Sequence, residues 1–434
     1  SPPERHLTPL ARAQARYLVL CLDGVGYDVV EEMYRRGQLR HFHAPVPLIA
    51  PFPTLTNLGL VEILAPLGAP PARGYEDYYF GPAANKMEGG FFHRFHRKSF
   101  IEGSYRQIFH YHPSPLAMTF EYGVPVLGPW VASRLTLNRI KREFLKSREP
   151  VFLAYLDSTD PAAHLGGRWT LRDVLHQVDL LAGQLQHHPR VPVEVVLFSD
   201  HGNAFGKWHK VDVGGALERA GLRVEDRLRD ERSVVIPQYG LIGAAVLYTQ
   251  PGREAAVAEI LLPTPGVDLV AYRAVEAVHI LGEKGRARLL RRGVTFRYEV
   301  QTGDPLELLP LVELLRAQGR TDAEGFIHED DWFQATANHI YPDPVRRLWY
   351  AFEGLVAHSA SVVISLKDGY YAGSGLVDFL SGFQLRATHG NLRRTQSLGF
   401  AMSTSGTLLV PPAPLVPSGA EGSNAEGSGA EGPV

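Results

Sequence analysis

The sequence predicts an α/β protein with a mostly parallel central sheet that is sandwiched between helices. Three short apolar segments each run into an aspartate, and a helical pattern lies between the second and the third. Such apolar runs, bounded by turn-forming residues, are typical of strands buried on both faces. Strands that alternate with helices favour right-handed crossovers and a parallel sheet.

The strand-like segments are far apart in the chain, but the fold class brings their ends together. In open α/β sheets, ligands bind beyond the carboxyl ends of the strands. We therefore expect Asp23, Asp160 and Asp200 to gather at one edge of the sheet. The segments are YLVLCLDG (Tyr17 to Gly24), VFLAYLDSTD (Val151 to Asp160) and VEVVLFSDHG (Val193 to Gly202).

An amphipathic helix is predicted from Thr170 to His187. Thr170 is the expected N-cap, and Asp173 is placed to complete a capping box. One face of this helix would pack on the sheet. Its apolar residues are Leu171, Val174, Leu175, Val178, Leu181 and Leu185.

Composition excludes several classes of protein. The chain has 434 residues, of which 45% are hydrophobic and 21% are charged, and this is typical of a globular protein. The net charge of −2 argues against binding to a nucleic-acid duplex and against a polybasic membrane anchor. The single cysteine, Cys21, excludes an internal disulfide and a cysteine-rich zinc module.

The cellular compartment and the oligomeric state stay open. No apolar run reaches the roughly 18 residues of a membrane-spanning helix, so we expect no transmembrane segment. The chain begins at Ser1 without a methionine, which is compatible with an export signal removed before this residue.

We expect one catalytic domain over residues 1–410, with two additions to its sheet. Residues 67–123 lack clean periodicity and are interpreted as an inserted cap over the edge of the sheet. Residues 266–304 alternate around a GEKG turn, as antiparallel strands do. Residues 411–434 are rich in Pro, Gly, Ser and Glu and are predicted to be a disordered tail.

The cap sequence is rich in aromatic and basic residues. The simplest interpretation is that the aromatic residues form the small core of the cap and that the basic residues are surface charge. The alternative is that some of them stack on a planar leaving group or bind a second anionic group of a substrate. The residues are Phe91, Phe92, Phe95, Tyr105 and Phe109, and Arg94, Arg97, Lys98 and Arg106.

Carboxylate and imidazole groups recur after the predicted strands. Asp160 and His164 are four residues apart, so a helical turn would place both on one face, where they could share a divalent cation. Asp157 is the rival ligand, but the spacing to His164 favours Asp160. An aspartate after a strand is, taken alone, more often a helix cap than a metal ligand.

Three further motifs extend this pattern along the chain. LDG supplies Asp23, SDHG supplies Asp200 and His201, and ATHG supplies His389. Each motif is short enough to arise by chance, so the indication of a metal site comes from their combination and order.

The segment PFPTLTN, residues 51–57, contains two threonines but no neighbouring base. A threonine hydroxyl is scarcely ionised near neutrality, so it needs a base or a Lewis acid to react. Thr56 begins an apolar, helix-like stretch, and the N-terminus of a helix favours a phosphate anion. The local residues alone do not decide between Thr54 and Thr56.

In their combined order, these motifs resemble the alkaline phosphatase superfamily, and within it the nucleotide pyrophosphatase/phosphodiesterase branch. The resemblance extends from Tyr17 to Gly406. FPTLTN is similar to the nucleophile segment of that branch, and the other segments are similar to its metal-binding motifs. These are YLDSTDPAAHLGG, FSDHG and ATHG.

The resemblance implies a role for each of these residues. Thr56 would be the nucleophile and a metal ligand between two ions, Thr54 would be structural, and Asn57 would contact a substrate oxygen. The implied ligands of one ion are Asp160, His164 and His389, and those of the other are Asp23, Asp200 and His201.

The expected cofactors are two divalent metal ions. Mixed imidazole and carboxylate ligands suit zinc best, and manganese is the alternative. Two ions about 3.5–4 Å apart can stabilise the attacking and leaving oxygens of a displacement at phosphorus.

The resemblance therefore implies a hydrolase that cleaves phosphodiester or nucleotide pyrophosphate bonds of a small substrate through a covalent phospho-threonine. A phosphomonoesterase or a phosphonate hydrolase is the alternative within the same chemistry. A binding protein that has lost catalysis is disfavoured because the ligand set is complete. A sulfatase is disfavoured because Cys21 lies within a strand and lacks the sequence context of a formylglycine.

Overall fold

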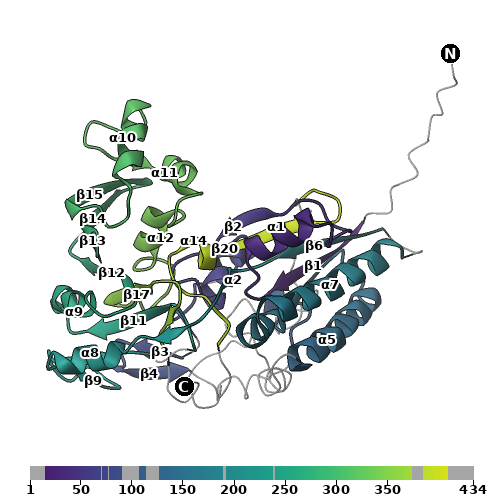
Figure 1. Cartoon of the computed structure of the whole chain (residues 1–434), viewed down its shortest axis with the longest axis horizontal. Helices are drawn as coiled ribbons and strands as arrows, with labels where there is room; N and C mark the ends of the chain where they lie inside the picture. The colour runs from purple at the N-terminus through teal and green to yellow at the C-terminus, as the bar shows by residue number, and fades with distance from the viewer. Residues whose placement is uncertain are drawn as a thin grey trace, which may run out of the picture.

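The computed structural model describes residues 15–69, 71–76, 78–89, 107–113, 127–188, 192–237, 240–373 and 385–408. Figure 1 shows two sheets, each accompanied by its own helices. The predicted tail, residues 411–434, lies outside the described residues. So do eight of the nine aromatic and basic cap residues, namely Phe91, Phe92, Arg94, Phe95, Arg97, Lys98, Tyr105 and Arg106.

The central sheet has five strands in the order β2-β20-β6-β1-β5. β1 pairs in parallel with both β5 and β6, so the three predicted strands form the parallel core of the sheet. β20 runs antiparallel to β6, and β2 runs antiparallel to β20. The strands are β1 (Arg16–Leu22), β2 (Val46–Ile49), β5 (Val151–Leu156), β6 (Val193–Phe198) and β20 (Leu398–Ser403).

Helices cover both faces of this sheet, which confirms the predicted α/β fold class. Side chains alternate between the two faces of a strand. Leu18, Leu20 and Leu22 pack on one face with α1 (Tyr27–Arg35), α5 (Leu127–Lys146) and α7 (Gly167–Gln186). Val19 and Cys21 pack on the other face with α2 (Thr56–Leu64).

The predicted apolar face of α7 is buried, but the predicted start of this helix is wrong. All six apolar residues are at most 5% exposed. Thr170, however, lies inside the helix and does not cap it, because the chain is already helical before Gly167. Two short helical segments precede α7, namely α6 (Thr159–Pro161) and the π-helical turn η3 (Ala162–Gly166).

The second sheet has nine strands in the order β16-β15-β14-β13-β12-β17-β11-β10-β9. Adjacent strands of this sheet pair antiparallel, except that β9 and β10 pair in parallel. The alternating stretch at residues 266–304 coincides with β12 to β15. The strands are β9 (Arg223–Val224), β10 (Ser233–Val235), β11 (Ala244–Thr249), β12 (Val267–Ala274), β13 (Ala277–Gly282), β14 (Gly285–Arg292), β15 (Thr295–Gly303), β16 (Ile327–His328) and β17 (Val362–Leu366).

This sheet also has apolar clusters on both faces. One cluster includes residues of α8 (Val213–Arg219) and α9 (Glu254–Leu261). The other includes residues of α10 (Leu309–Ala317), α11 (Glu329–Thr336) and α12 (Pro344–Tyr350).

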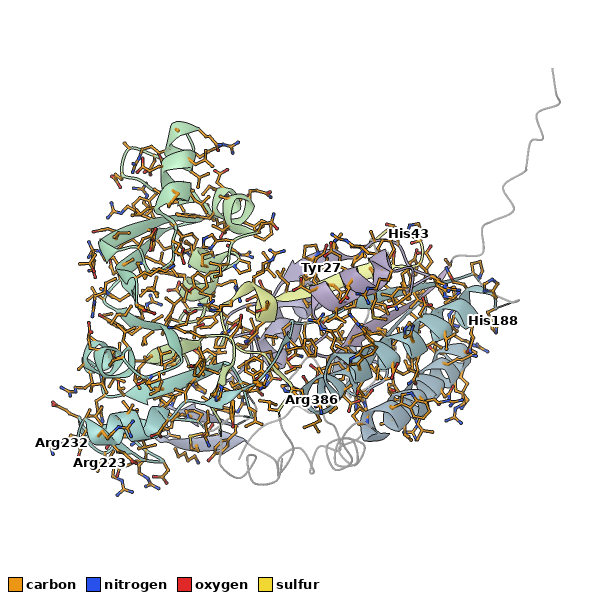
Figure 2. All side chains as sticks on the ribbon, in the orientation of Figure 1. Tyr27, His43, His188, Arg223, Arg232 and Arg386 are labelled. Carbon is orange, nitrogen blue, oxygen red and sulfur yellow. The ribbon has the colours of Figure 1, made fainter. Side chains whose placement is uncertain are left out.

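Several short elements lie outside the two large sheets. In the view of Figure 2, Arg386 lies between the two sheets, directly before β19. The remaining elements are η1 (Ala65–Leu67), β3 (Tyr78–Gly81), β4 (Lys86–Gly89), β7 (Ala204–Phe205), β8 (His209–Lys210), β18 (Tyr370–Tyr371), β19 (Ala387–Thr388) and α14 (Arg394–Ser397).

Phe109, the one of the nine aromatic and basic cap residues that the structure describes, packs against the central sheet. Its ring meets the ring of Tyr155 edge-on, with the centroids 5.7 Å apart. The backbone beside it follows β5, because the N–H of His110 donates to the carbonyl of Leu153. Among the described helices, none combines the length and the apolar composition that crossing a bilayer requires.

Candidate metal centre

The six aspartates and histidines that the sequence singles out as metal ligands come together in two groups of three. Within each group, one nitrogen or oxygen atom of each residue lies within 4.8 Å of those of the other two. Five of the six side chains are buried, and Asp160 is half-buried. One group comprises Asp160, His164 and His389, and the other comprises Asp23, Asp200 and His201.

The first group depends on the helical segment that follows β5. Asp160 lies on α6 and His164 on η3, and this turn places His164 Nε2 3.0 Å from Asp160 Oδ1. His389 comes from the loop after β19, with its Nε2 4.0 Å from the same oxygen. Asp157 belongs to neither group.

The second group lies at the ends of β1 and β6, as the parallel sheet predicts. His201 Nε2 is 3.8 Å from Asp23 Oδ1 and 3.5 Å from Asp200 Oδ2. Gly24, which follows Asp23, has φ +62°, and a Cβ atom there would lie 2.9 Å from Asp160 Oδ1. Only glycine fits this close approach of the two groups.

The two groups are adjacent through their imidazole rings. The rings of His201 and His389 stack with their centroids 3.9 Å apart. His201 Nδ1 lies 2.9 Å from the carbonyl of Gly202, and His389 Nδ1 lies 2.8 Å from that of Thr54. Because a carbonyl only accepts, Nδ1 of each ring carries the proton, and the lone pair of Nε2 is left for a metal.

Burial and repulsion between carboxylates favour a cation at this centre. Burial lowers the pKa of His201 to about 4 and that of His389 to about 3, so both rings are neutral near pH 7, the form that binds a metal. Burial also raises the pKa of Asp200 to about 6. Burial, together with the charges of Asp200 and Asp160, raises the pKa of Asp23 well above its usual value. A bound cation would offset the burial and the mutual repulsion of these two carboxylates and would lower their pKa values.

An unsatisfied oxygen provides an independent test of whether these residues fit a metal ion. Asp200 Oδ2 is buried and has no hydrogen-bond partner among the described residues. Leaving a buried acceptor without a donor costs about 1–3 kcal/mol, and more when it is charged. Carboxylate and imidazole groups that converge around such an oxygen fit a divalent cation.

Thr56 lies beside the second group. It is the first residue of α2, and its Oγ1 donates to Asp23 Oδ1 at 3.2 Å. The same oxygen lies 3.2 Å from His201 Nε2. Asn57 follows it in the first turn of α2 and is half-buried.

Thr54 has a structural position. It is fully buried, and its Oγ1 accepts from the N–H of Gly390 at 2.7 Å and donates to the carbonyl of Asn391 at 3.2 Å. Its own carbonyl is the partner of the His389 ring. Thr54 therefore holds the loop of His389 in place, while Thr56 faces the carboxylates.

Two residues that contact a proposed ligand or the loops around the centre were not predicted. The phenol of Tyr155 donates to Asp23 Oδ2 at 2.5 Å. The guanidinium of Arg347 donates to the carbonyls of Pro51 and Leu392, on the two loops that Thr54 joins. The sequence indicates neither role, because the hydrogen-bond partners of Tyr155 and Arg347 are distant from them in the chain.

No protein-family model and no curated protein matches the chain. Similar solved structures include phosphonoacetate hydrolase from Sinorhizobium meliloti in complex with phosphonoformate, with 12% identity, 93% of each chain covered and a TM-score of 0.46. They also include murine ectonucleotide pyrophosphatase/phosphodiesterase 5, with 12% identity, 89% of this chain and 87% of that chain covered and a TM-score of 0.45. The human counterpart has the same identity and coverage and a TM-score of 0.43. These similarities are too distant to carry an activity over, so a function has to be argued from the centre itself.

Proposed function

We propose that the protein is a metal-dependent hydrolase that cleaves phosphodiester or nucleotide pyrophosphate bonds, with Thr56 as the nucleophile. The observation that carries this proposal is the position of Thr56 Oγ1, 3.2 Å from both Asp23 Oδ1 and His201 Nε2. A hydroxyl group at the N-terminus of a helix, next to two groups of metal-binding side chains, suits attack on a phosphoryl group.

Each group of side chains would hold one divalent ion. Zinc suits the mixed ligands best, and manganese is the alternative. When bound, the two ions supply Lewis acidity and offset the negative charge that develops on the phosphoryl oxygens. The first ion is assigned to Asp160, His164 and His389, and the second to Asp23, Asp200, His201 and Thr56.

The chain contributes a nucleophile and a binding surface for the phosphoryl group. Thr56 Oγ1 forms a bond to phosphorus while the bond from phosphorus to the leaving oxygen breaks. The proton of the hydroxyl passes to the leaving oxygen or to solvent, and the leaving group departs as an alcohol or a phosphate. Asp23 Oδ1 accepts the hydrogen bond of the hydroxyl before this attack. Asn57 and the first N–H groups of α2 are assigned to the non-bridging oxygens.

A second displacement regenerates the enzyme. The oxygen of a water molecule forms a bond to phosphorus while the bond from Thr56 Oγ1 to phosphorus breaks. Thr56 Oγ1 takes up one proton of this water molecule, and the product leaves as a phosphomonoester or a nucleotide.

Rates on paired chromogenic substrates test the proposal. Metal-replete protein should hydrolyse bis(p-nitrophenyl) phosphate faster than p-nitrophenyl phosphate. Thr56→Ala should lower turnover about 10³-fold or more, because no other hydroxyl replaces the nucleophile, and it should leave the metal content nearly intact. Thr56→Ser, which keeps a hydroxyl, should retain part of the activity.

Three outcomes would contradict the proposal. Full activity of Thr56→Ala would move the nucleophile elsewhere, and an inert, metal-free protein would support a binding function. A faster monoester reaction would favour the phosphomonoesterase alternative with the same nucleophile.

A further inference from the structure

We infer that Tyr155 is a positioning residue for the metal centre, because its phenol holds one oxygen of Asp23 and leaves the other to face the metal. The inference rests on the proposed function and deepens it by adding a residue that acts through a metal ligand.

The two oxygens of Asp23 have different partners. Oδ2 accepts the hydrogen bond of the Tyr155 phenol at 2.5 Å. Oδ1 accepts from Thr56 Oγ1 at 3.2 Å and lies 3.8 Å from His201 Nε2. The backbone of Asp23 is also held, because Thr159 Oγ1 donates to its carbonyl at 2.7 Å.

Tyr155 is held by the sheet itself. It lies on β5, where it pairs with Cys21 of β1, two residues before Asp23. Its side chain is fully buried and meets the ring of Phe109 edge-on. Its backbone N–H donates to the carbonyl of Tyr111 at 3.0 Å. The phenol therefore reaches Asp23 from a rigid strand, which suits a group that fixes a metal ligand.

A carboxylate can bind a metal through one oxygen or through both, and it can rotate about its Cβ–Cγ bond. A strong donor on Oδ2 selects one rotamer and directs Oδ1 to the metal. Without the phenol, Oδ2 would be a buried acceptor without this donor, and the carboxylate could turn away from the metal. Loss of such an outer partner typically weakens metal binding 10- to 100-fold.

A purely structural role is the competing explanation, and Tyr75 provides a matched control for it. Tyr75 is also fully buried, and its hydroxyl donates to the carbonyl of Ala351 at 2.6 Å and accepts from the N–H of Ala360 at 3.0 Å. It belongs to the apolar cluster of the second sheet. Tyr75→Phe therefore removes a buried phenol bond of similar length without touching a proposed ligand.

The test is a metal titration of the full chain. Metal-free wild-type, Tyr155→Phe and Tyr75→Phe proteins are titrated at one pH with Zn²⁺ against a competing chelator and with Co²⁺, whose visible spectrum reports its ligands. We expect two ions in the wild type. In Tyr155→Phe, one of them should bind about 10- to 100-fold more weakly with an altered Co²⁺ spectrum, while the other is unchanged. In Tyr75→Phe, both should bind as in the wild type.

The outcomes separate this inference from the proposed function. If Tyr155→Phe binds both ions as the wild type does, the positioning role is overturned and the proposed function stands. If the wild type itself binds no metal, the proposed function fails. If Tyr155→Phe does not fold, 3-fluorotyrosine at position 155 keeps the ring and strengthens the phenol as a donor. Unchanged affinity and an unchanged Co²⁺ spectrum for that protein would then overturn the inference.

Discussion

Asp157 and Asp160 are three residues apart, but burial and one histidine partner shift the pKa values of their carboxyl groups in opposite directions. Burial alone would raise the pKa of Asp160, but the charge and the hydrogen bond of His164 hold it below its usual value. Neither oxygen of Asp157 has a hydrogen-bond partner among the described residues, and burial raises the pKa of this group to about 7. The spacing to His164 could be read from the sequence, but this difference could not, because it depends on tertiary burial.

Asp157 should make the stability of the metal-free protein depend on pH. Its folded pKa of about 7 lies above the unfolded value of about 3.9, so the folded state binds more protons between these values. Its contribution to stability is therefore present below pH 4 and is lost as the pH rises to 7. Relative to the wild type, Asp157→Asn should gain about 2–3 kcal/mol between pH 5 and pH 8.

Urea unfolding of the metal-free proteins at these two pH values measures this difference. The same difference in unfolding free energy at both values would mean that Asp157 is ionised in the folded protein throughout the range.

At the scale of the element, the centre depends on how closely two helical segments approach the sheet. α2 begins at Thr56 and places Gly59 against the loop after β6, where a Cβ atom would lie 2.7 Å from the carbonyl oxygen of Asp200. The apolar run after Thr56 predicted a helix, but a glycine within it appears in the sequence only as a weak point. In the structure, the absence of a side chain at Gly59 lets α2 approach the loop after β6, and this brings Thr56 close to the carboxylates.

The segment from Thr159 to Gln186 shows where local patterns fail. The four-residue spacing of Asp160 and His164 correctly predicted that they face each other. The capping signal at Thr170 was misleading, because a π-helical turn runs directly into α7. π-helical turns often occur at functional sites, and they have no simple sequence pattern.

Gly59→Ala should destabilise the protein and lower its activity. Alanine is the better helix former by about 1 kcal/mol, but the backbone of Asp200 would have to move to admit its methyl group. We expect a net loss of about 1–3 kcal/mol in unfolding free energy, as in other overpacked sites, together with a fall in kcat as Thr56 shifts.

Gly214→Ala is the matched control, because Gly214 lies in α8 and its added Cβ would have only Val224 nearby, at 3.8 Å. Denaturant unfolding and steady-state kinetics should show that this variant is at least as stable as the wild type and equally active. Equal effects of the two substitutions would contradict the role of the close approach at Gly59.

At the scale of the whole molecule, the part of the chain with the second sheet supports the loops of the centre. Arg347 is 4% exposed and lies on α12, which packs on that sheet. Its guanidinium donates to the carbonyls of Pro51 and Leu392 and to Ser397 Oγ. Pro51 precedes the nucleophile segment, and Leu392 follows His389. The second sheet thus helps to position Thr56 and His389 together.

The central sheet was predictable, and much of the second sheet was not. Three long apolar strands that end in aspartate leave a clear pattern, and the order of the ligand motifs adds information that no single motif has. The stretch at residues 266–304 indicated antiparallel strands by its alternation. Strands of two or three residues, such as β9, β10 and β16, are too short to show any period. The second arginine of PVRRLWY would be taken for a surface residue, because its partners are remote in the chain.

Arg347→Met should be strongly destabilising. The change leaves several buried oxygens without their donor, and each loss costs about 1–3 kcal/mol, so we expect a total of about 3–5 kcal/mol. The loop of His389 should also become less well held. We therefore expect the ion that His389 binds to lose more affinity than the other ion.

Arg316→Met is the comparison for this change, since the side chain of Arg316 is 55% exposed and pairs at 2.6 Å with Glu313, which is also exposed. Chemical unfolding and metal analysis of both variants distinguish the two sites. If Arg347→Met were no less stable than Arg316→Met, the two loops would not depend on this contact.

The central claim is that two groups of side chains hold a pair of divalent ions beside Thr56. Anomalous diffraction from crystals of the zinc-loaded protein tests it most directly. We expect two peaks about 3.5–4 Å apart, one bound by Asp160, His164 and His389 and the other by Asp23, Asp200 and His201, with Thr56 Oγ1 between them. Zinc peaks elsewhere, or none within bonding distance of these six side chains, would contradict the account.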